Sequence, residues 1–312
     1  MKTYNVAIAI NRGYFLWAMV TLNSVLKNNT HNFINFYISH NNCFCEDDAE
    51  YIYNSPVFKK YNNFKIIFLN VVSYANEIKF LSQPSSSIWG GEVWFKLFYE
   101  KLLPDVDKIL YLDVDLIVHN DLSDLFAVNI DNKLFMGDKL YTAINGGALL
   151  INLKLSREKS VLEQTVRYKQ NNNIKIHLTD ESLINILYHN DISFNQQHMY
   201  TLSTKRTKIS KEEINNFITI HYVARKPWIM SSWKKFAIHF NKIYYSYYKD
   251  CVKPKFIIQY YGIMLYNIYI HRIIYSFSVR IKKFFKIDTT IVNPNKYIIK
   301  KMKQISYFKD FN

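Results

Sequence analysis

Residues 108–115 read Lys-Ile-Leu-Tyr-Leu-Asp-Val-Asp, an apolar run that ends in two carboxylates. The apolar run predicts a buried central strand. Open α/β sheets bind ligands at the carboxyl ends of their strands, so Asp113 and Asp115 are expected at a ligand site. On an extended chain, residues i and i+2 point the same way, and both acids can face one cation. Because Mg²⁺ and Mn²⁺ take oxygen ligands and bridge to phosphate, the pair predicts a metal site that holds a diphosphate.

Strand and helix patterns alternate on both sides of this stretch, which predicts an α/β fold with a mostly parallel sheet and covering helices. Short apolar runs predict strands at residues 4–10, 33–39, 64–69, 147–153 and 217–222. Helical periodicity is found at residues 14–26, from residue 46, and at 92–102, 158–168 and 180–188. With 312 residues, 49% of them hydrophobic, the chain can bury a sizeable core.

Positive charge is concentrated at the C-terminal end. The whole chain carries +15, and residues 231–312 hold 14 Lys and 2 Arg against 3 Asp and no Glu. The first 230 residues are therefore nearly neutral, which argues against a uniformly basic nucleic-acid-binding protein. We expect one large domain over residues 1–230 and a basic, aromatic, helical appendage over residues 231–312. A biased coding composition, rich in Asn, Lys, Ile and Tyr, could by itself explain part of this charge.

Residues 256–270 are uncharged, rich in Ile and Tyr, and flanked by basic residues. This segment is shorter than the ~20 residues that span a bilayer, so an interfacial segment is predicted. Tyrosines suit the headgroup layer, and each basic residue near an anionic surface adds about 1 kcal/mol. An anionic membrane surface is therefore the expected partner of residues 231–312. The alternative is a helix that packs on the preceding domain.

The cysteines and the N-terminus indicate a reducing location. Cys43, Cys45 and Cys251 are odd in number and form no CxxC pair, so neither a disulfide framework nor a cysteine zinc site is predicted. The first ten residues predict a strand and not a secretory signal peptide. We expect a cytoplasmic protein that lies peripherally on the inner face of the cell membrane.

Four stretches, in this order, resemble the motifs of glycosyltransferase family 8. They are Leu-Pro-Asp-Val-Asp-Lys-Ile-Leu-Tyr-Leu-Asp-Val-Asp at 103–115, Asn-Gly-Gly-Ala-Leu-Leu-Ile-Asn-Leu at 145–153, Asp-Glu-Ser-Leu-Ile-Asn at 180–185, and His-Tyr at 221–222 with Lys-Pro-Trp at 226–228. Four ordered motifs are more specific than any one of them. That family includes bacterial lipopolysaccharide galactosyl- and glucosyltransferases and glycogenin. The resemblance covers residues 4 to about 230 and implies a GT-A catalytic domain, a Rossmann-like sheet with covering helices, over residues 1–230.

The resemblance also implies an activity and a cofactor. It implies a retaining hexosyltransferase that uses Mn²⁺, or Mg²⁺, to move galactose or glucose from a UDP-sugar to a glycan or lipid-linked glycan such as lipopolysaccharide or lipooligosaccharide. By motif position, Asp113, Asp115 and His221 would be the metal ligands. An imidazole beside two carboxylates favours Mn²⁺ over Mg²⁺. A hydrogen-bonded core histidine is the alternative for His221.

Lys226 follows His221 closely, and the resemblance implies that it contacts the diphosphate, where it would neutralise charge on the leaving group. The alternative is a solvated surface lysine. The family usually has four residues, including a glycine, between the His-aromatic pair and Lys-Pro-Trp. This chain has only Val223-Ala224-Arg225, and Arg225 can supply a guanidinium contact in place of the missing backbone contact.

Two neighbouring acids are the predicted catalytic residues. Asp180 matches a family position that holds the sugar's hydroxyls, as do Asp138 and Asn145. Glu181 stands where the family often has glutamine, beneath the anomeric centre, and a carboxylate there could form a covalent intermediate or stabilise an oxocarbenium-like state. The alternatives are a helix N-cap for Asp180, an exposed first-turn glutamate for Glu181 and a simple turn at Asn145.

The remaining donor-binding positions come from the same resemblance. Ile10, Asn11 and Tyr14 match the family's first strand and uridine-binding turn, where an acid usually reads the base. Asn11 can still hydrogen-bond to uracil, through different donors and acceptors, and Tyr14 could stack on the base. Val114 lies between the two acids of the metal pair. Lys96 replaces a common arginine near the donor, which keeps the charge and loses the planar fork.

Other functions are less well supported. No GxGxxG follows the first strand and no GxxxxGK[ST] is present, which excludes the usual nicotinamide and P-loop enzymes. A catalytically degenerate relative that binds nucleotide sugars, membranes or RNA without turnover remains the alternative. The intact acids, histidine and lysine of the motifs favour an enzyme, and no specific nucleic acid is expected as a partner.

Overall fold

The computed structural model describes residues 1–83, 91–172, 179–202, 209–223, 226–228 and 238–252. The chain divides into two compact units. The first consists of Met1–Leu202 and Lys208–His221, and the second of Ser203–Thr207 and Tyr222–Asn312. The expected domain boundary at residue 230 remains a prediction.

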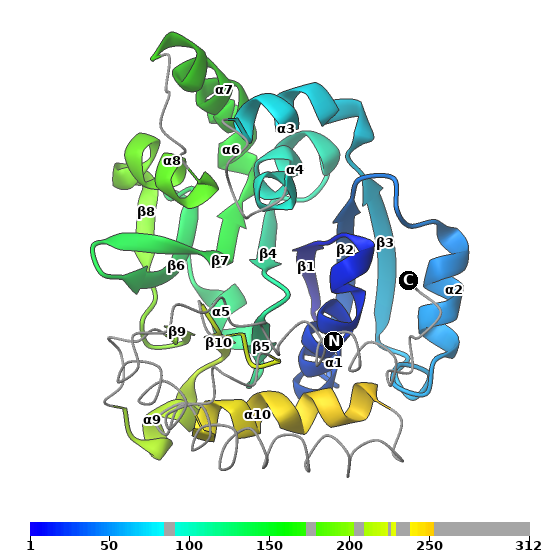
Figure 1. Cartoon of the computed structure of the whole chain (residues 1–312). Coiled ribbons are helices and arrows are strands. Elements are labelled where there is room, and N and C mark those ends of the chain that lie inside the picture. Colours follow the sequence, from blue (N-terminus) through cyan, green and yellow to red (C-terminus); the bar gives the residue numbers. More distant parts are fainter. Residues whose placement is uncertain (84–90, 173–178, 203–208, 224–225, 229–237, 253–312) are drawn as a thin grey trace, which may run out of the picture. The chain divides into compact units, whose positions relative to one another are not determined.

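A seven-stranded mixed sheet forms the centre of the first unit, in the order β3-β2-β1-β4-β7-β6-β8 (Figure 1). The strands are β1 Thr3–Ala9, β2 Phe33–His40, β3 Phe64–Asn70, β4 Lys108–Leu112, β6 Phe135–Leu140, β7 Ala143–Asn152 and β8 Ile192–Phe194. Strands β3, β2, β1 and β4 are parallel, and β7 runs opposite to its neighbours β4 and β6. The predicted α/β fold with a mostly parallel sheet is confirmed.

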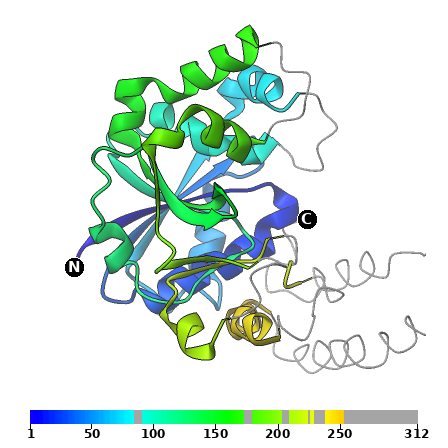
Figure 2. The same ribbon diagram turned by 90° about the vertical axis from the view of Figure 1, so that its left-hand side faces the viewer.

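Helices cover both faces of this sheet, which is why β4 is buried along most of its length. Figures 1 and 2 together show α1 on one face and α6, α7 and α8 on the other. The α-helices are α1 Phe15–Asn28, α2 Glu46–Asn54, α3 Ala75–Leu81, α4 Tyr99–Leu102, α5 Ser123–Ala127, α6 Leu153–Lys159, α7 Val161–Asn171, α8 Asp180–Leu187 and α9 Lys211–Asn216. The 3₁₀ helices are η1 Arg12–Tyr14, η2 Val72–Tyr74, η3 Gly91–Phe98 and η4 His189–Asp191.

Three predicted elements differ from the structure. The helix expected at 92–102 is η3 followed by α4, because its aromatic and aliphatic side chains are buried together instead of forming one stripe. The helix expected at 158–168 is interrupted at Ser160, which has a left-handed φ of 52° and separates α6 from α7. The strand expected from residue 147 begins earlier, because β7 pairs with β6 in a hairpin.

A second, three-stranded sheet places the last residues of the first unit beside the end of β4. It consists of β5 Leu116–Val118, β9 Met199–Thr201 and β10 Thr219–His221, in the order β5-β10-β9. β5 begins one turn after β4, and β10 pairs with it in antiparallel register, with His221 opposite Leu116. A histidine far away in the sequence is thereby placed beside the carboxyl end of β4.

The described part of the second unit contains α10 Ile238–Tyr248 and η7 Lys249–Cys251. Its aromatic side chains pack on one another: the Tyr244 ring lies 5.5 Å from that of Tyr222 and 6.0 Å from that of Trp228. The predicted interfacial segment, residues 256–270, lies outside the described residues. Within the described ranges, none of the helices combines the length and the apolar character needed to cross a bilayer.

Candidate active site

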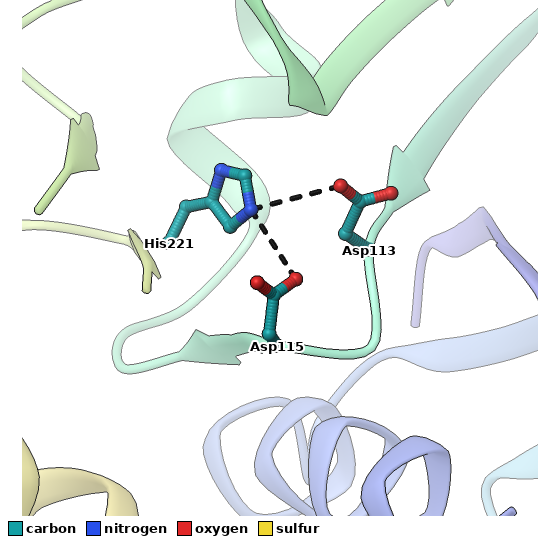
Figure 3. A group of neighbouring side chains, drawn as sticks. All are labelled: Asp113, Asp115 and His221. Atoms are coloured by element: carbon teal, nitrogen blue, oxygen red, sulfur yellow. Dashed lines mark ion pairs between the residues drawn. The ribbon is translucent and has the colours of Figure 1, made fainter. Parts of the chain in front are cut away.

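Asp113, Asp115 and His221 converge beside the end of β4 (Figure 3). His221 Nε2 lies 3.6 Å from Asp113 Oδ2 and 3.3 Å from Asp115 Oδ1. One ligand atom of each residue lies within 4.8 Å of those of the other two. The predicted extended geometry of the two acids is wrong, because the chain turns at residues 114–115 before β5 begins. The turn, and not strand alternation, brings the two carboxylates together.

The three side chains fit a divalent cation. Two carboxylate oxygens and one imidazole nitrogen form a donor set that suits Mn²⁺ better than Mg²⁺. A histidine must be neutral to bind a metal. Burial lowers the pKa of His221, and the charge of Asp113 opposes this shift only in part, so the ring is held neutral near pH 7. The donor set and the protonation state of His221 therefore both suit a metal ion.

Gly147 allows the close approach of His221 to β7. A Cβ atom added at this position would overlap the His221 ring. The backbone of Gly147 also accepts a hydrogen bond from the Asp113 N–H, at 2.7 Å. Any larger residue at position 147 would displace a metal-ligand candidate, which explains the need for glycine in the second predicted motif.

Asp180 lies in the first turn of α8 and forms a buried ion pair with Lys96. Lys96 Nζ lies 2.6 Å from Asp180 Oδ2 and donates to the Gly146 carbonyl at 2.8 Å. It also lies 4.3 Å from the centre of the Tyr111 ring. Burial alone would lower the pKa of Lys96, but Asp180 and Asp113 outweigh it and raise this pKa. Lys96 therefore stays charged inside the protein.

The N-cap interpretation of Asp180 is wrong by one residue. Thr179 is the N-cap of α8, and its side chain accepts from the Ser182 N–H at 3.1 Å. Asp180 is the next residue, and its carboxylate is turned to Lys96 instead of to the helix backbone. Its carboxylate therefore faces a buried ammonium group and does not cap the helix.

Glu181 is half-buried and held by two donors, so the alternative of an exposed first-turn glutamate is wrong. Its Oε2 accepts from the Gly146 N–H at 2.8 Å and from Asn145 Nδ2 at 3.0 Å. Burial raises the pKa of Glu181, and the bond from Gly146 opposes that shift. Asn145 lies within β7, so the alternative of a simple turn at this residue is also wrong.

Tyr111 is a site residue that the sequence reasoning missed. Its hydroxyl donates to Asp113 Oδ1 at 2.7 Å, and its side chain is buried. The available signal was its position two residues before Asp113, because residues i and i+2 of a strand share a face. Tyr111 thus links the metal-ligand candidates to Lys96.

Asp138 and Lys226 are two further residues that are predicted to bind the donor. Asp138 is buried on β6, and its Oδ2 accepts from the Thr201 N–H at 2.7 Å. Lys226 is half-buried and belongs to the second unit, so its contact with a diphosphate stays a prediction. The contact of Asp138 with the transferred sugar also stays a prediction.

The predicted uridine-binding residues follow β1, the parallel neighbour of β4. Ile10 is buried, and Tyr14 is 44% exposed. Asn11 accepts from the Gly13 N–H at 2.9 Å and donates to Glu92 Oε1 at 3.0 Å. Val114 is half-buried, and its carbonyl accepts from the Thr21 hydroxyl at 3.1 Å. The predicted uridine-binding residues lie at the same edge of the sheet as the metal-ligand candidates, since β1 and β4 are parallel.

Solved glycosyltransferase structures share this fold. The galactosyltransferase LgtC, in complex with donor and acceptor sugar analogs, matches with a TM-score of 0.59 and 18% identity over 78% of this chain and 95% of LgtC. GlyE of Streptococcus pneumoniae TIGR4 matches with a TM-score of 0.58 and 17% identity over 80% of this chain and 60% of GlyE. The fold is therefore that of GT-A glycosyltransferases.

The chain belongs to glycosyl transferase family 8, whose sequence model matches residues 5–143 and 136–232. It is 23% identical over 276 residues to the lipopolysaccharide 1,2-glucosyltransferase of Escherichia coli K12, covering 78% of this chain and 76% of that protein. It is 29% identical over 140 residues to the probable glycosyl transferase Gly of Streptococcus gordonii, covering 39% of this chain and 20% of that protein. The resemblance inferred from the four motifs is confirmed.

Proposed function

We propose that this protein is a retaining, metal-dependent hexosyltransferase that moves galactose or glucose from a UDP-sugar to a glycan or lipid-linked glycan such as lipopolysaccharide or lipooligosaccharide. The observation that carries the proposal is the convergence of Asp113, Asp115 and His221 close to the α8 acids Asp180 and Glu181. Membership of family 8 and the similarity to a lipopolysaccharide glucosyltransferase support it.

Asp113, Asp115 and His221 would hold Mn²⁺ or, less well, Mg²⁺. The bound ion supplies positive charge that holds the diphosphate and offsets the charge on the leaving group. Lys226 would add a second positive charge there. The donor's uridine would lie at the end of β1, against Ile10, Asn11, Tyr14 and Val114.

The transferred sugar would lie between Asp138 and Asp180, which can accept hydrogen bonds from its hydroxyls. Lys96 would act near the donor by holding Asp180, since it is buried against that carboxylate and the Gly146 carbonyl. Asn145 would complete this side of the sugar site.

Retention can follow two routes, and Glu181 distinguishes them. We favour same-face attack, in which the leaving phosphate accepts the acceptor's proton and Glu181 stabilises positive charge at the anomeric carbon. In support, Glu181 Oε2 already accepts two hydrogen bonds, which reduce its nucleophilicity. The other route is covalent attack by Glu181.

An anionic membrane surface is proposed as the partner of residues 231–312, which would keep the enzyme peripheral on the inner face of the membrane beside a lipid-linked acceptor. This proposal rests on charge and tyrosine content alone. Removing residues 253–312 should release the protein from anionic vesicles and spare donor hydrolysis. Failure of the full-length chain to sediment with such vesicles at low salt would contradict it.

The enzyme assignment is tested with a panel of UDP-sugars, by measuring UDP release with Mn²⁺, with Mg²⁺ and with EDTA. We expect hydrolysis of UDP-galactose or UDP-glucose that requires the metal, with Asp115→Asn as the inactive control. An NMR spectrum of the transfer product should show an α linkage from the α-linked donor. No turnover with any donor would favour a catalytically degenerate binding protein.

A further inference from the structure

His221 is held through the ring nitrogen that faces away from the two acids. Its Nδ1 lies 2.7 Å from Asn145 Oδ1, and both side chains are buried. Two other contacts fix which way the Asn145 amide points: Oδ1 also accepts from the Gly147 N–H at 3.2 Å, and Nδ2 donates to Glu181 at 3.0 Å. An amide oxygen only accepts, so His221 Nδ1 must carry the proton. The other ring nitrogen, Nε2, faces Asp113 and Asp115.

Asp113 is held in a comparable way by Tyr111. The Tyr111 hydroxyl donates to Asp113 Oδ1 at 2.7 Å, while the other carboxylate oxygen, Oδ2, faces His221. Tyr111 itself is fixed by burial, with Lys96 Nζ 4.3 Å from its ring centre. Asp113 Oδ1 thus accepts a hydrogen bond from Tyr111, and Asp113 Oδ2 faces the His221 imidazole.

Each holding residue also connects to one of the two acids at the start of α8. Asn145 donates to Glu181, and the Tyr111 ring lies against Lys96, which pairs with Asp180. Asp180 and Glu181, which are adjacent on α8, are therefore each linked to a different metal-ligand candidate through the side chains between them.

We propose that Asn145 and Tyr111 are positioning residues, which orient His221 and Asp113 for the metal before it binds. Partners of this kind fix the tautomer and orientation of metal ligands, and their loss weakens metal binding. For Asn145, this role stands beside the sugar contact implied by the family resemblance, since Oδ1 bonds to His221 and Gly147 while Nδ2 has a second hydrogen besides the one donated to Glu181. The proposal rests on the proposed metal site.

The test is a Mn²⁺ titration of the full chain, with free Mn²⁺ measured by electron paramagnetic resonance. Tyr111→Phe removes only the hydroxyl and keeps the ring beside Lys96. We expect it to weaken Mn²⁺ binding by about 10-fold or more. The matched control is Tyr99→Phe, because Tyr99 is equally buried and its hydroxyl bonds to Ser39, at 2.8 Å, instead of to a metal-ligand candidate. It should bind Mn²⁺ like the wild type.

Asn145→Ala should weaken Mn²⁺ binding by about 10- to 100-fold. Asn145→Asp keeps an acceptor for His221 Nδ1 but sets a carboxylate oxygen against Glu181, so it should recover most of the affinity only together with Glu181→Gln. Long-range ¹H–¹⁵N spectra of the metal-free protein should show His221 with Nδ1 protonated in the wild type and a mixture of tautomers in Asn145→Ala. The His221 signals are assigned by comparison with His221→Gln.

The outcomes distinguish an absent metal site from an absent positioning role. Failure of the wild type to bind Mn²⁺ would overturn the metal site and this proposal with it. Wild-type affinity in both Tyr111→Phe and Asn145→Ala would overturn the positioning role alone. Equal losses of Mn²⁺ affinity in Tyr111→Phe and Tyr99→Phe would mean that packing, and not the hydrogen bond from Tyr111 to Asp113, sets the affinity. That result would also contradict the proposal.

Discussion

Strands β1 and β4 are parallel neighbours that end at the same edge of the sheet, and the side chains that follow them are held differently. After β4, Asp113 is bound by Tyr111 and faces His221, and these contacts continue to α8. After β1, Asn11 holds its own turn and donates to Glu92, and Tyr14 is 44% exposed. The end of β4 is therefore a prebuilt charged site, in which one substitution affects several groups. Substitutions after β1 should act more locally.

The largest effect is expected at the end of β4. Asp113→Asn or Asp115→Asn should lower Mn²⁺-dependent transfer by several orders of magnitude, because each removes the charge of a metal-ligand candidate. The circular dichroism spectrum and the melting temperature should stay close to wild type. Substantial UDP release by either variant at saturating Mn²⁺ would contradict the assignment of these acids to a metal site. The end of β4 would then be no more sensitive to substitution than the end of β1.

Glu181→Gln tests how far the α8 acids take part in the chemistry. If Glu181 stabilises positive charge, the variant should keep measurable activity, about 10- to 100-fold below wild type. A covalent nucleophile would leave almost none. Mass spectrometry of the wild type incubated with donor should show no glycosylated Glu181, and a trapped sugar on this residue would reverse our choice of route.

A smaller effect is expected at the end of β1. Asn11→Ala should raise the KM for the UDP-sugar about 10-fold with little change in kcat, because a base contact contributes to binding and not to the transition state alone. It also removes the cap of η1, which costs about 1 kcal/mol of stability.

Asn70→Ala is the matched control for this prediction. Asn70 ends β3, and its side chain likewise holds a turn, accepting from the Val72 N–H at 3.0 Å. It should show the same loss of stability with an unchanged KM. If both variants have the KM of the wild type, Asn11 is a turn residue and does not bind the base.

A pH dependence is expected away from both strand ends, and it affects stability and not activity. Burial raises the pKa of Glu100 to about 6, although hydrogen bonds from the backbone of Leu162 and Val161 lower it. Because the folded pKa lies above the ordinary 4.5, protonation favours the folded state. The contribution is present at low pH and is lost as the pH rises through about 6.

The unfolding free energy of the wild type, relative to Glu100→Gln, should therefore fall by about 2 kcal/mol between pH 4 and pH 7. Urea denaturation at a series of pH values measures this difference. A flat difference would show that Glu100 ionises normally. The Glu100→Gln background then allows the pH dependence of the two strand ends to be compared without this contribution.

Much of the fold followed from local patterns. The apolar run before Asp113 predicted β4, and the alternation of strands and helices predicted the α/β sheet. The breaks at Ser160 and within residues 91–102 were missed, because they depend on packing and on a left-handed residue that carries no glycine signal.

The contacts of the site were harder to predict from the sequence, because they join segments that are distant along the chain. His221 could be associated with Asp113 only through the family resemblance, since β10 reaches β4 by pairing with β5. The buried pair of Lys96 and Asp180 and the bond from Tyr111 to Asp113 depend on how β4, η3 and α8 pack. The alternation of a strand predicts on which face of the sheet Tyr111 lies, but not which group its hydroxyl bonds to.

We expect one divalent ion to bind between Asp113, Asp115 and His221. Pulsed electron paramagnetic resonance of the Mn²⁺-loaded protein tests it directly, because it detects nitrogen bound to the ion. The wild type should show hyperfine coupling from one imidazole nitrogen, and His221→Gln should lack it. Coordination by oxygen alone in the wild type, or nitrogen coupling that persists in His221→Gln, would contradict the account.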